Sequence, residues 1–174
     1  DSGAPVIGLE PSCLFTLKDE FPALLPGEDS EKLSQYAVLL EQYLVNEKKA
    51  RRLNLKLKKA TQPIILHGHC HQKSFAAMED VVGALKLIPE AQVETVQSSC
   101  CGMAGAYGYG TDTYEMSMAM GELSLIPAVR EANDKTRIVA DGFSCRHQIS
   151  DGTGRSARHA VHLLDEALPA SARK

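Results

Sequence analysis

The chain has 174 residues, of which 44% are hydrophobic, so it is long enough to bury the core of one compact domain. Aromatic residues make up 5% and the formal net charge is −3, so the composition offers neither a stacking platform nor a broad basic face for nucleic acid. No apolar run approaches the roughly 20 residues of a membrane helix, and the first residues lack the blocks of a signal peptide. We therefore expect a soluble domain without a transmembrane segment, whose partners are small molecules or proteins.

Four short apolar runs bounded by turn residues predict buried strands, at residues 6–9, 64–67, 93–96 and 138–140. Helical periodicity predicts helices between and after them, at about residues 30–49, 70–87, 113–133 and 158–168. A basic run at residues 51–59 is short and has no aromatic residue, so it is predicted to be a solvated connector. Strands that alternate with helices imply an α/β fold, with a mostly parallel sheet and helices on both faces.

The five cysteines are an odd number, which argues against a full set of disulfides and favours a reducing compartment. Each follows a predicted strand; they are Cys13, Cys70, Cys100, Cys101 and Cys145. Because the carboxyl ends of parallel strands meet at one edge of a sheet, we expect these thiols to converge there. Helices that begin near Cys13 and Cys145 are expected to lower the pKa of both thiols.

Clustered thiolates are soft ligands, and they select an iron–sulfur cluster or zinc over harder cations. Gly102 opens a glycine-rich stretch at residues 102–110, whose backbone can approach a bulky ligand and donate amide hydrogens to it. His69 and His71 flank Cys70, and they can either ligate a metal or cap the following helix. His159 is expected at the surface or on a helix face.

Four segments carry a resemblance to a known family. They are Glu10-Pro11-Ser12-Cys13, His67-Gly68-His69-Cys70-His71-Gln72-Lys73, Ser99-Cys100-Cys101-Gly102-Met103-Ala104-Gly105 and Ala140-Asp141-Gly142-Phe143-Ser144-Cys145-Arg146. With these segments the chain resembles the cysteine-rich CCG domain of heterodisulfide reductase and of the iron–sulfur subunits of glycolate oxidase and anaerobic glycerol-3-phosphate dehydrogenase. It resembles most of all the C-terminal part of large FAD-linked D-2-hydroxy-acid (D-lactate type) dehydrogenases. The resemblance spans nearly the whole chain.

The family pattern is one cysteine, then Cys-Cys-Gly, then C-x-x-C, often in two copies. Cys70 matches the first cysteine, Cys100-Cys101 the pair, and Cys145 the last cysteine. Gly142 stands where the family has the first cysteine of C-x-x-C, which removes one ligand. Cys13 resembles the last cysteine of a preceding copy, and the resemblance implies that it can serve as a fifth ligand.

The resemblance implies an iron–sulfur cluster, either a 4Fe-4S cubane or a non-cubane cluster with five thiolates, with zinc as the alternative. It implies that residues 1–174 are a single domain at the C-terminus of a longer cytoplasmic oxidoreductase, which can also lie against the inner membrane face. FAD would bind in another domain or subunit, and electrons would pass from the flavin through the cluster to an acceptor such as a quinone. The domain would not catalyse the oxidation alone. Two other functions stay open, a zinc-stabilised interaction domain and a thiol–disulfide redox module.

Overall fold

The structure is a computed structural model that describes residues 3–98 and 100–172. Its strands are β1 (Val6–Gly8), β2 (Ala37–Leu39), β3 (Ile64–His67), β4 (Val93–Thr95) and β5 (Arg137–Ala140). Its α-helices are α1 (Pro11–Thr16), α2 (Glu20–Leu24), α3 (Glu28–Tyr36), α4 (Leu40–Lys49), α5 (Cys70–Ser74), α6 (Met78–Leu85), α7 (Tyr114–Glu122), α8 (Leu125–Glu131), α9 (Phe143–Thr153) and α10 (Ala160–Ala167). Two 3-10 helices are η1 (Tyr107–Tyr109) and η2 (Ala170–Ala172).

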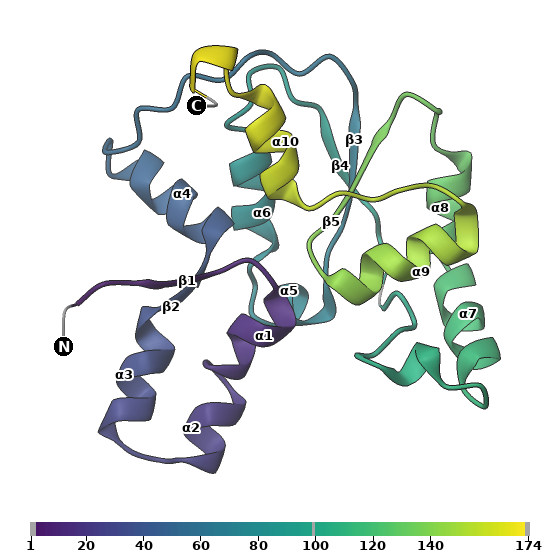
Figure 1. Cartoon of the computed structure of the whole chain (residues 1–174), viewed down its shortest axis with the longest axis horizontal. Coiled ribbons are helices and arrows are strands. Elements are labelled where there is room, and N and C mark those ends of the chain that lie inside the picture. The colour runs from purple at the N-terminus through teal and green to yellow at the C-terminus, as the bar shows by residue number, and fades with distance from the viewer. Residues whose placement is uncertain (1–2, 99, 173–174) are drawn as a thin grey trace.

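Three strands form the central sheet, in the order β4-β3-β5, and both pairings are parallel (Figure 1). Alternate residues of β5 enter two different apolar clusters. Val139 packs with residues of α6 and α10, while Ile138 and Ala140 pack with residues of α8 and α9. The sheet is therefore covered by helices on both faces, which confirms the predicted α/β fold.

All four predicted strands are present, and their ends lie within one residue of the predicted ends. The prediction that all are buried is wrong for β1 and β4. In β1, Val6 is 41% exposed and Ile7 is 43% exposed, and no residue of β4 is buried. The physical reason is position, because β4 is an edge strand and β1 lies outside the central sheet.

The long helix predicted at residues 30–49 is divided into α3, β2 and α4. The three residues of β2 pair in parallel with β1, and Ala37 and Leu39 are almost fully buried there. Pairing with a distant strand outweighs the helical spacing of these apolar residues. Consequently β1 and β2 form a separate two-stranded sheet.

Two other predicted helices are also divided. The helix predicted at 70–87 becomes α5 and α6, and between them Ala76 has a left-handed backbone with φ of 53°. The helix predicted at 113–133 becomes α7 and α8, whereas α10 agrees with its prediction and α2 was not predicted.

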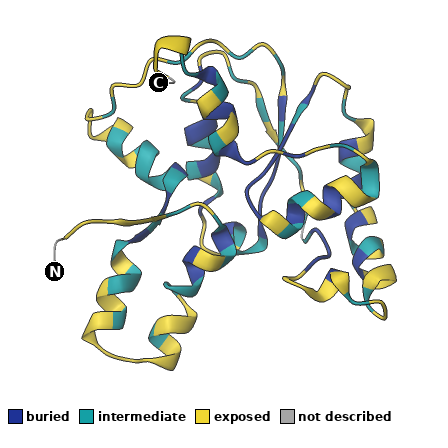
Figure 2. Ribbon diagram, in the orientation of Figure 1, coloured by how far each residue is buried: buried dark blue, intermediate teal, exposed yellow. Residues whose placement is uncertain are grey.

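Burial is concentrated in β3, β5 and the helix sides that face them, whereas α2 and α3 contain no buried residue (Figure 2). None of the described helices has both the length and the apolar character needed to cross a membrane.

Candidate metal centre

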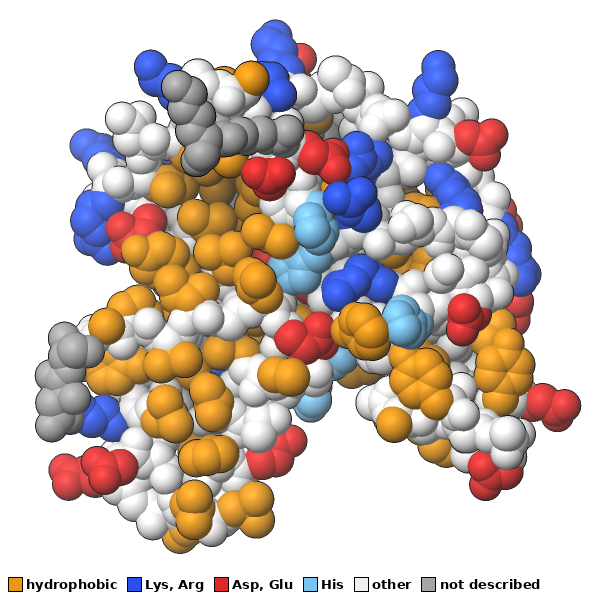
Figure 3. All heavy atoms as spheres, in the orientation of Figure 1, with side chains coloured by type: hydrophobic (Ala, Val, Ile, Leu, Met, Phe, Trp, Pro, Cys, Tyr) orange, Lys and Arg blue, Asp and Glu red, His pale blue; other side chains and the backbone are white. Residues whose placement is uncertain are grey.

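Four cysteines lie at the carboxyl edge of the central sheet. Cys70 is the first residue of α5, directly after β3, and Cys145 lies in the first turn of α9, shortly after β5. Cys100 and Cys101 follow β4. Figure 1 shows α5 at the lower end of the sheet, which is the end at which β3 stops. Figure 3 shows an indentation at the lower edge of the molecule in this view, and histidine side chains lie at its upper end.

Cys101 and Cys145 form a buried pair beside His67. One ring nitrogen of His67 and the two Sγ atoms all lie within 4.8 Å of one another. The hydrogen bond with Cys145 lowers the pKa of Cys101 to about 4, helped by the His67 ring and the Met103 amide and opposed by burial. That same hydrogen bond, together with burial, raises the pKa of Cys145 far above its ordinary value. At neutral pH the pair is one thiolate and one thiol.

The expectation of a lowered pKa for Cys145 at a helix N-terminus is therefore wrong. The neighbouring Cys101 carries the negative charge, and a second thiolate beside it in a buried site is strongly disfavoured.

Cys70 and Cys100 form a second pair of sulfurs. Burial, followed by a hydrogen bond with Cys100, raises the pKa of Cys70 to about 11. The backbone amide of Gly102 donates to Cys100 Sγ at 3.2 Å. Gly102 has φ of 99°, and a Cβ there would lie 2.0 Å from the Ser117 carbonyl oxygen. Only glycine can place its amide at this sulfur, because any side chain would collide with the backbone of α7.

One positive side chain, that of Lys73, interacts with the thiols, and a second, that of Arg146, binds the backbone at the end of β5. Lys73 Nζ donates to the carbonyl oxygen of Ser98. Burial lowers the pKa of Lys73, while the charges of the four cysteines at this edge raise it. The ammonium group of Lys73 therefore interacts electrostatically with all four thiols. Arg146 donates to the carbonyl oxygen of Ala140 at 3.0 Å and to that of Asp141. The charge of Lys73 favours thiolates and an anionic ligand at the edge.

His67 is a site residue that the sequence reasoning did not identify. It is the last residue of β3 and is 1% exposed. Its Nδ1 lies 2.9 Å from Ser98 Oγ, and its Nε2 is buried without a hydrogen-bond partner among the described residues. Burial lowers its pKa, which keeps the ring neutral. The available signal was its place at the carboxyl end of a strand, the same feature that marked the cysteines.

His69 caps α5, which was one of the roles that the sequence left open beside metal ligation and bonding to backbone carbonyls. Its Nδ1 accepts from the His71 amide at 3.2 Å, and its own amide donates to Gln72 Oε1 at 2.9 Å. The His71 ring lies 6.4 Å from the Phe15 ring of α1 and 5.3 Å from the ring of His69.

Cys13 lies in α1, after β1, and is exposed. Because β1 pairs with β2, the edge of the central sheet collects four of the five cysteines. The turn before α1 nevertheless contacts the starts of α9 and α10, since Glu10 Oε2 accepts from the Phe143 amide at 3.0 Å and Leu9 O accepts from His159 Nε2 at 2.9 Å. The role of Cys13 as a ligand stays a prediction.

A second buried group joins Glu41, Asp141 and His159, whose ligand atoms lie within 4.8 Å of one another. His159 is 6% exposed, so its predicted surface position is wrong. Asp141 accepts from Gln72 Nε2 at 2.7 Å and from the Ala160 amide at 2.9 Å. Neither carboxylate oxygen of Glu41 has a hydrogen-bond partner among the described residues, and burial, together with the charge of Asp141, raises the pKa of Glu41 to about 8.

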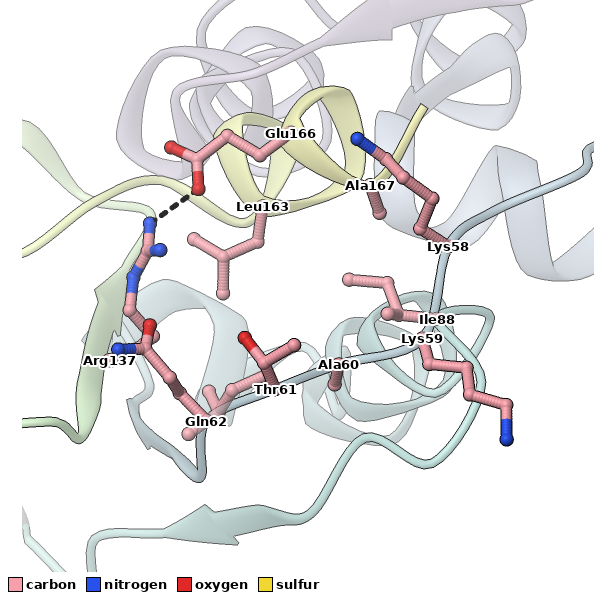
Figure 4. Close-up of a pocket in the computed structure, with 11 residues that line it drawn as sticks. Lys58, Lys59, Ala60, Thr61, Gln62, Ile88, Arg137, Leu163, Glu166 and Ala167 are labelled. Atoms are coloured by element: carbon pink, nitrogen blue, oxygen red, sulfur yellow. Dashed lines mark hydrogen bonds and ion pairs between the residues drawn. The ribbon is translucent and has the colours of Figure 1, made fainter. Parts of the chain in front are cut away.

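A cavity of about 310 Å³ lies at the opposite end of the sheet, beside α10 (Figure 4). Ile64 and Arg137, the first residues of β3 and β5, line it, and Arg137 pairs with Glu166 at 2.7 Å. None of the described residues that line it is a cysteine or a histidine. This cavity therefore lies apart from the four thiols at the carboxyl edge.

Comparison with known proteins finds relatives along almost the whole chain. One of them, a subunit of the anaerobic glycerol-3-phosphate dehydrogenase from Escherichia coli (strain K12), is 29% identical over 168 residues, which cover 95% of this chain and 41% of that protein. D-2-hydroxyglutarate dehydrogenase from the same strain is 29% identical over 175 residues, which cover 95% of this chain and 16% of that enzyme. The enzyme of the same name from Pseudomonas putida is 27% identical over 171 residues, with 94% of this chain and 15% of that enzyme covered.

The chain thus spans less than half of the length of each of these relatives. No protein-family profile matches the chain. No solved structure matches it.

Proposed function

We propose that this chain is an iron–sulfur cluster-binding, electron-transfer domain of a flavin-linked oxidoreductase that acts on 2-hydroxy acids. One observation carries the proposal: four cysteines gather at the carboxyl edge of one parallel sheet, with a buried unpaired histidine nitrogen beside them. The similarity to D-2-hydroxyglutarate dehydrogenases and to a subunit of a glycerol-3-phosphate dehydrogenase supports the same class of enzyme.

The donor set fits such a group. Four cysteine sulfurs are the ordinary ligand set of an iron–sulfur cluster, and Cys101 is already a thiolate at neutral pH. Lys73 supplies positive charge, and the Gly102 amide supplies a hydrogen bond to sulfur. When bound, a cluster takes up and releases electrons one at a time. The proposed ligands are Cys70, Cys100, Cys101 and Cys145, with Cys13 as the proposed fifth.

The proposal includes a longer protein of which residues 1–174 form one domain, because the relatives extend well beyond the matched region. FAD would bind in another domain or subunit, and the acceptor would be a quinone or a similar carrier on the cytoplasmic side of a membrane. Exposed aromatic side chains lie near the cysteines in the sequence and offer a face for that partner. Phe143 is 53% exposed and Tyr109 is 54% exposed, and Tyr109 Oη lies 2.7 Å from His147 Nδ1.

The test is anaerobic reconstitution with iron and sulfide, followed by iron, sulfide and zinc analysis and low-temperature EPR of both redox states. We expect about four irons per chain, with matching sulfide. Cys101→Ser should lose the cluster, while Ser144→Ala, a matched change beside Cys145, should retain it. Cys13→Ser tests the fifth ligand separately. Wild-type protein that takes up no iron would refute the proposal.

A structural zinc site is the second candidate, because two thiols and an imidazole in mutual reach are ordinary zinc ligands. Stoichiometric zinc without iron, together with a large loss of thermal stability on chelation, would establish it. A thiol–disulfide module is the third, supported by the Cys101 thiolate beside Cys145. Rapid stoichiometric reaction of the metal-free protein with a disulfide would favour it, although Cys101 is only 2% exposed.

A further inference from the structure

We infer that His67 is a metal ligand of this site through Nε2, and that its imidazole adds a nitrogen to the cysteine sulfurs. The inference rests on the proposed function, because it names a further ligand of the same centre. It concerns a residue to which the sequence pattern assigned no role.

The first argument is the burial of an unpaired nitrogen. His67 is 1% exposed, and its Nε2 has no hydrogen-bond partner in the described parts of the chain. Buried polar atoms are almost always paired, and besides Ser98 the neighbour of this ring is the Cys101 sulfur, a proposed ligand of the centre. The sulfurs of Cys101 and Cys145 and one ring nitrogen of His67 lie within 4.8 Å of one another. One metal ion could therefore be bound by all three side chains.

The second argument is the tautomer. His67 Nδ1 lies 2.9 Å from Ser98 Oγ, which also accepts from Lys73 Nζ at 3.4 Å. A hydroxyl oxygen has two lone pairs, so it can accept from the imidazole and from the ammonium together. The tautomer that can bind a metal has its proton on Nδ1, donating to Ser98 Oγ, and its lone pair on Nε2. Histidines that bind metals are held in the same way, with the distal nitrogen donating to a fixed acceptor.

The same reasoning excludes two other buried histidines. Nδ1 of His69 accepts from the His71 amide, and Nδ1 of His159 accepts from the Val161 amide at 3.0 Å. Their protons therefore sit on Nε2, which leaves no lone pair for a metal. His71 also has an unpaired buried Nδ1, but it belongs to no group of mutually close ligand atoms among the described residues.

The third argument is the space at Gly142, where the family pattern has a cysteine. A Cβ on Gly142 would lie 2.3 Å from His69 Cδ2 and 3.2 Å from Cys145 Sγ. The ring of His69 thus fills the place of that side chain, so no ligand can come from this position. His67 approaches Cys145 from β3 instead, and it supplies the buried donor that the pattern lacks.

A neutral imidazole in place of a thiolate makes a cluster less negative and raises its reduction potential, as histidine ligands do in Rieske centres. His67→Cys is therefore expected to shift the potential of the reconstituted centre downwards. His67→Gln should retain the fold and weaken metal binding by at least about tenfold.

The decisive measurement is nitrogen coordination in the wild-type protein, which needs no variant to fold. The chain is loaded anaerobically with iron and sulfide, and separately with zinc. X-ray absorption on the metal and pulsed EPR on reduced protein with ¹⁵N-labelled histidine then report directly bound nitrogen. We expect one such nitrogen, present in the matched control His71→Gln and absent in His67→Gln.

The outcomes separate the two proposals. A centre with iron and sulfide but no bound nitrogen overturns the role of His67 and leaves the electron-transfer proposal intact. Zinc alone, with one nitrogen that disappears in His67→Gln, supports His67 as a ligand and refutes the cluster. A chain that binds neither metal refutes both.

Discussion

Glu41 makes the stability of this protein depend on pH in an unusual direction. Its carboxyl group is fully buried, faces Asp141, and has no hydrogen-bond partner among the residues described here. An exposed glutamate ionises near 4.5, whereas burial and the charge of Asp141 raise the pKa of Glu41 to about 8 in the folded protein. Between these values the folded chain holds a proton that the unfolded chain releases.

The sign and size follow from proton linkage. Because the folded pKa is raised, the stability is complete below about pH 4.5 and is lost as the pH rises towards about 8. One proton contributes a slope of at most about 1.4 kcal/mol per pH unit. Since the pair with Asp141 shares its charge, we expect a loss on the order of 2 kcal/mol between pH 5 and pH 7. Glu41→Gln removes the ionisable group and should remove this slope.

The assay is urea unfolding of the reduced, metal-free protein at several pH values between about 5 and about 7.5. The difference between Glu41→Gln and wild type should grow in favour of the variant as the pH rises, whereas the exposed Glu115→Gln should follow wild type throughout. A difference that is constant with pH would refute the reasoning. A slope that disappears on adding a divalent cation would show instead that the Glu41 and Asp141 carboxylates bind a metal.

Three further predictions concern the site and its support. Gly102→Ala should lower the free energy of unfolding by about 2 kcal/mol or more, because its Cβ would meet a carbonyl oxygen at 2.0 Å. Gly105→Ala, also at positive φ but with open space around it, should cost only about 1 kcal/mol when both variants are unfolded in urea. Near pH 6 the metal-free protein should show thiolate absorbance, because the pKa of Cys101 is lowered to about 4; Cys101→Ser should lose this absorbance and Cys13→Ser should keep it. Arg155→Ala should destabilise by about 2–4 kcal/mol in urea, since its guanidinium donates to four backbone carbonyls around the end of α8.

The strands could be predicted because each is a continuous apolar run between turn residues. The strand β2 could not, because Ala37–Leu39 continues the helical spacing on both sides and becomes a strand only through pairing with β1. The break between α5 and α6 was equally hidden. It falls at Ala76, an alanine with a left-handed backbone, and alanine is the strongest helix former.

The site was predictable where residue type and position together carry the information. Cysteines after strands identify the carboxyl edge of a parallel sheet, and four of them lie there. His67 was missed although it also ends a strand, because its contact with Ser98 and its closeness to Cys101 and Cys145 appear only in the folded chain. The buried group of Glu41 and His159 was missed for a related reason, since it joins the start of α4 to the start of α10, far apart in sequence.

The proposed ligands are held in place by contacts that need no metal. Gln72, which is fully buried, accepts from the His69 amide and donates to Asp141, so one side chain ties the turn after β3 to the turn after β5. Arg146 binds the last carbonyl of β5 from within α9. The two turns carry Cys70 and Cys145, so their separation is fixed by the fold. A metal that binds there gains its ligands with little further loss of chain entropy, because the thiols stand on rigid elements at the sheet edge.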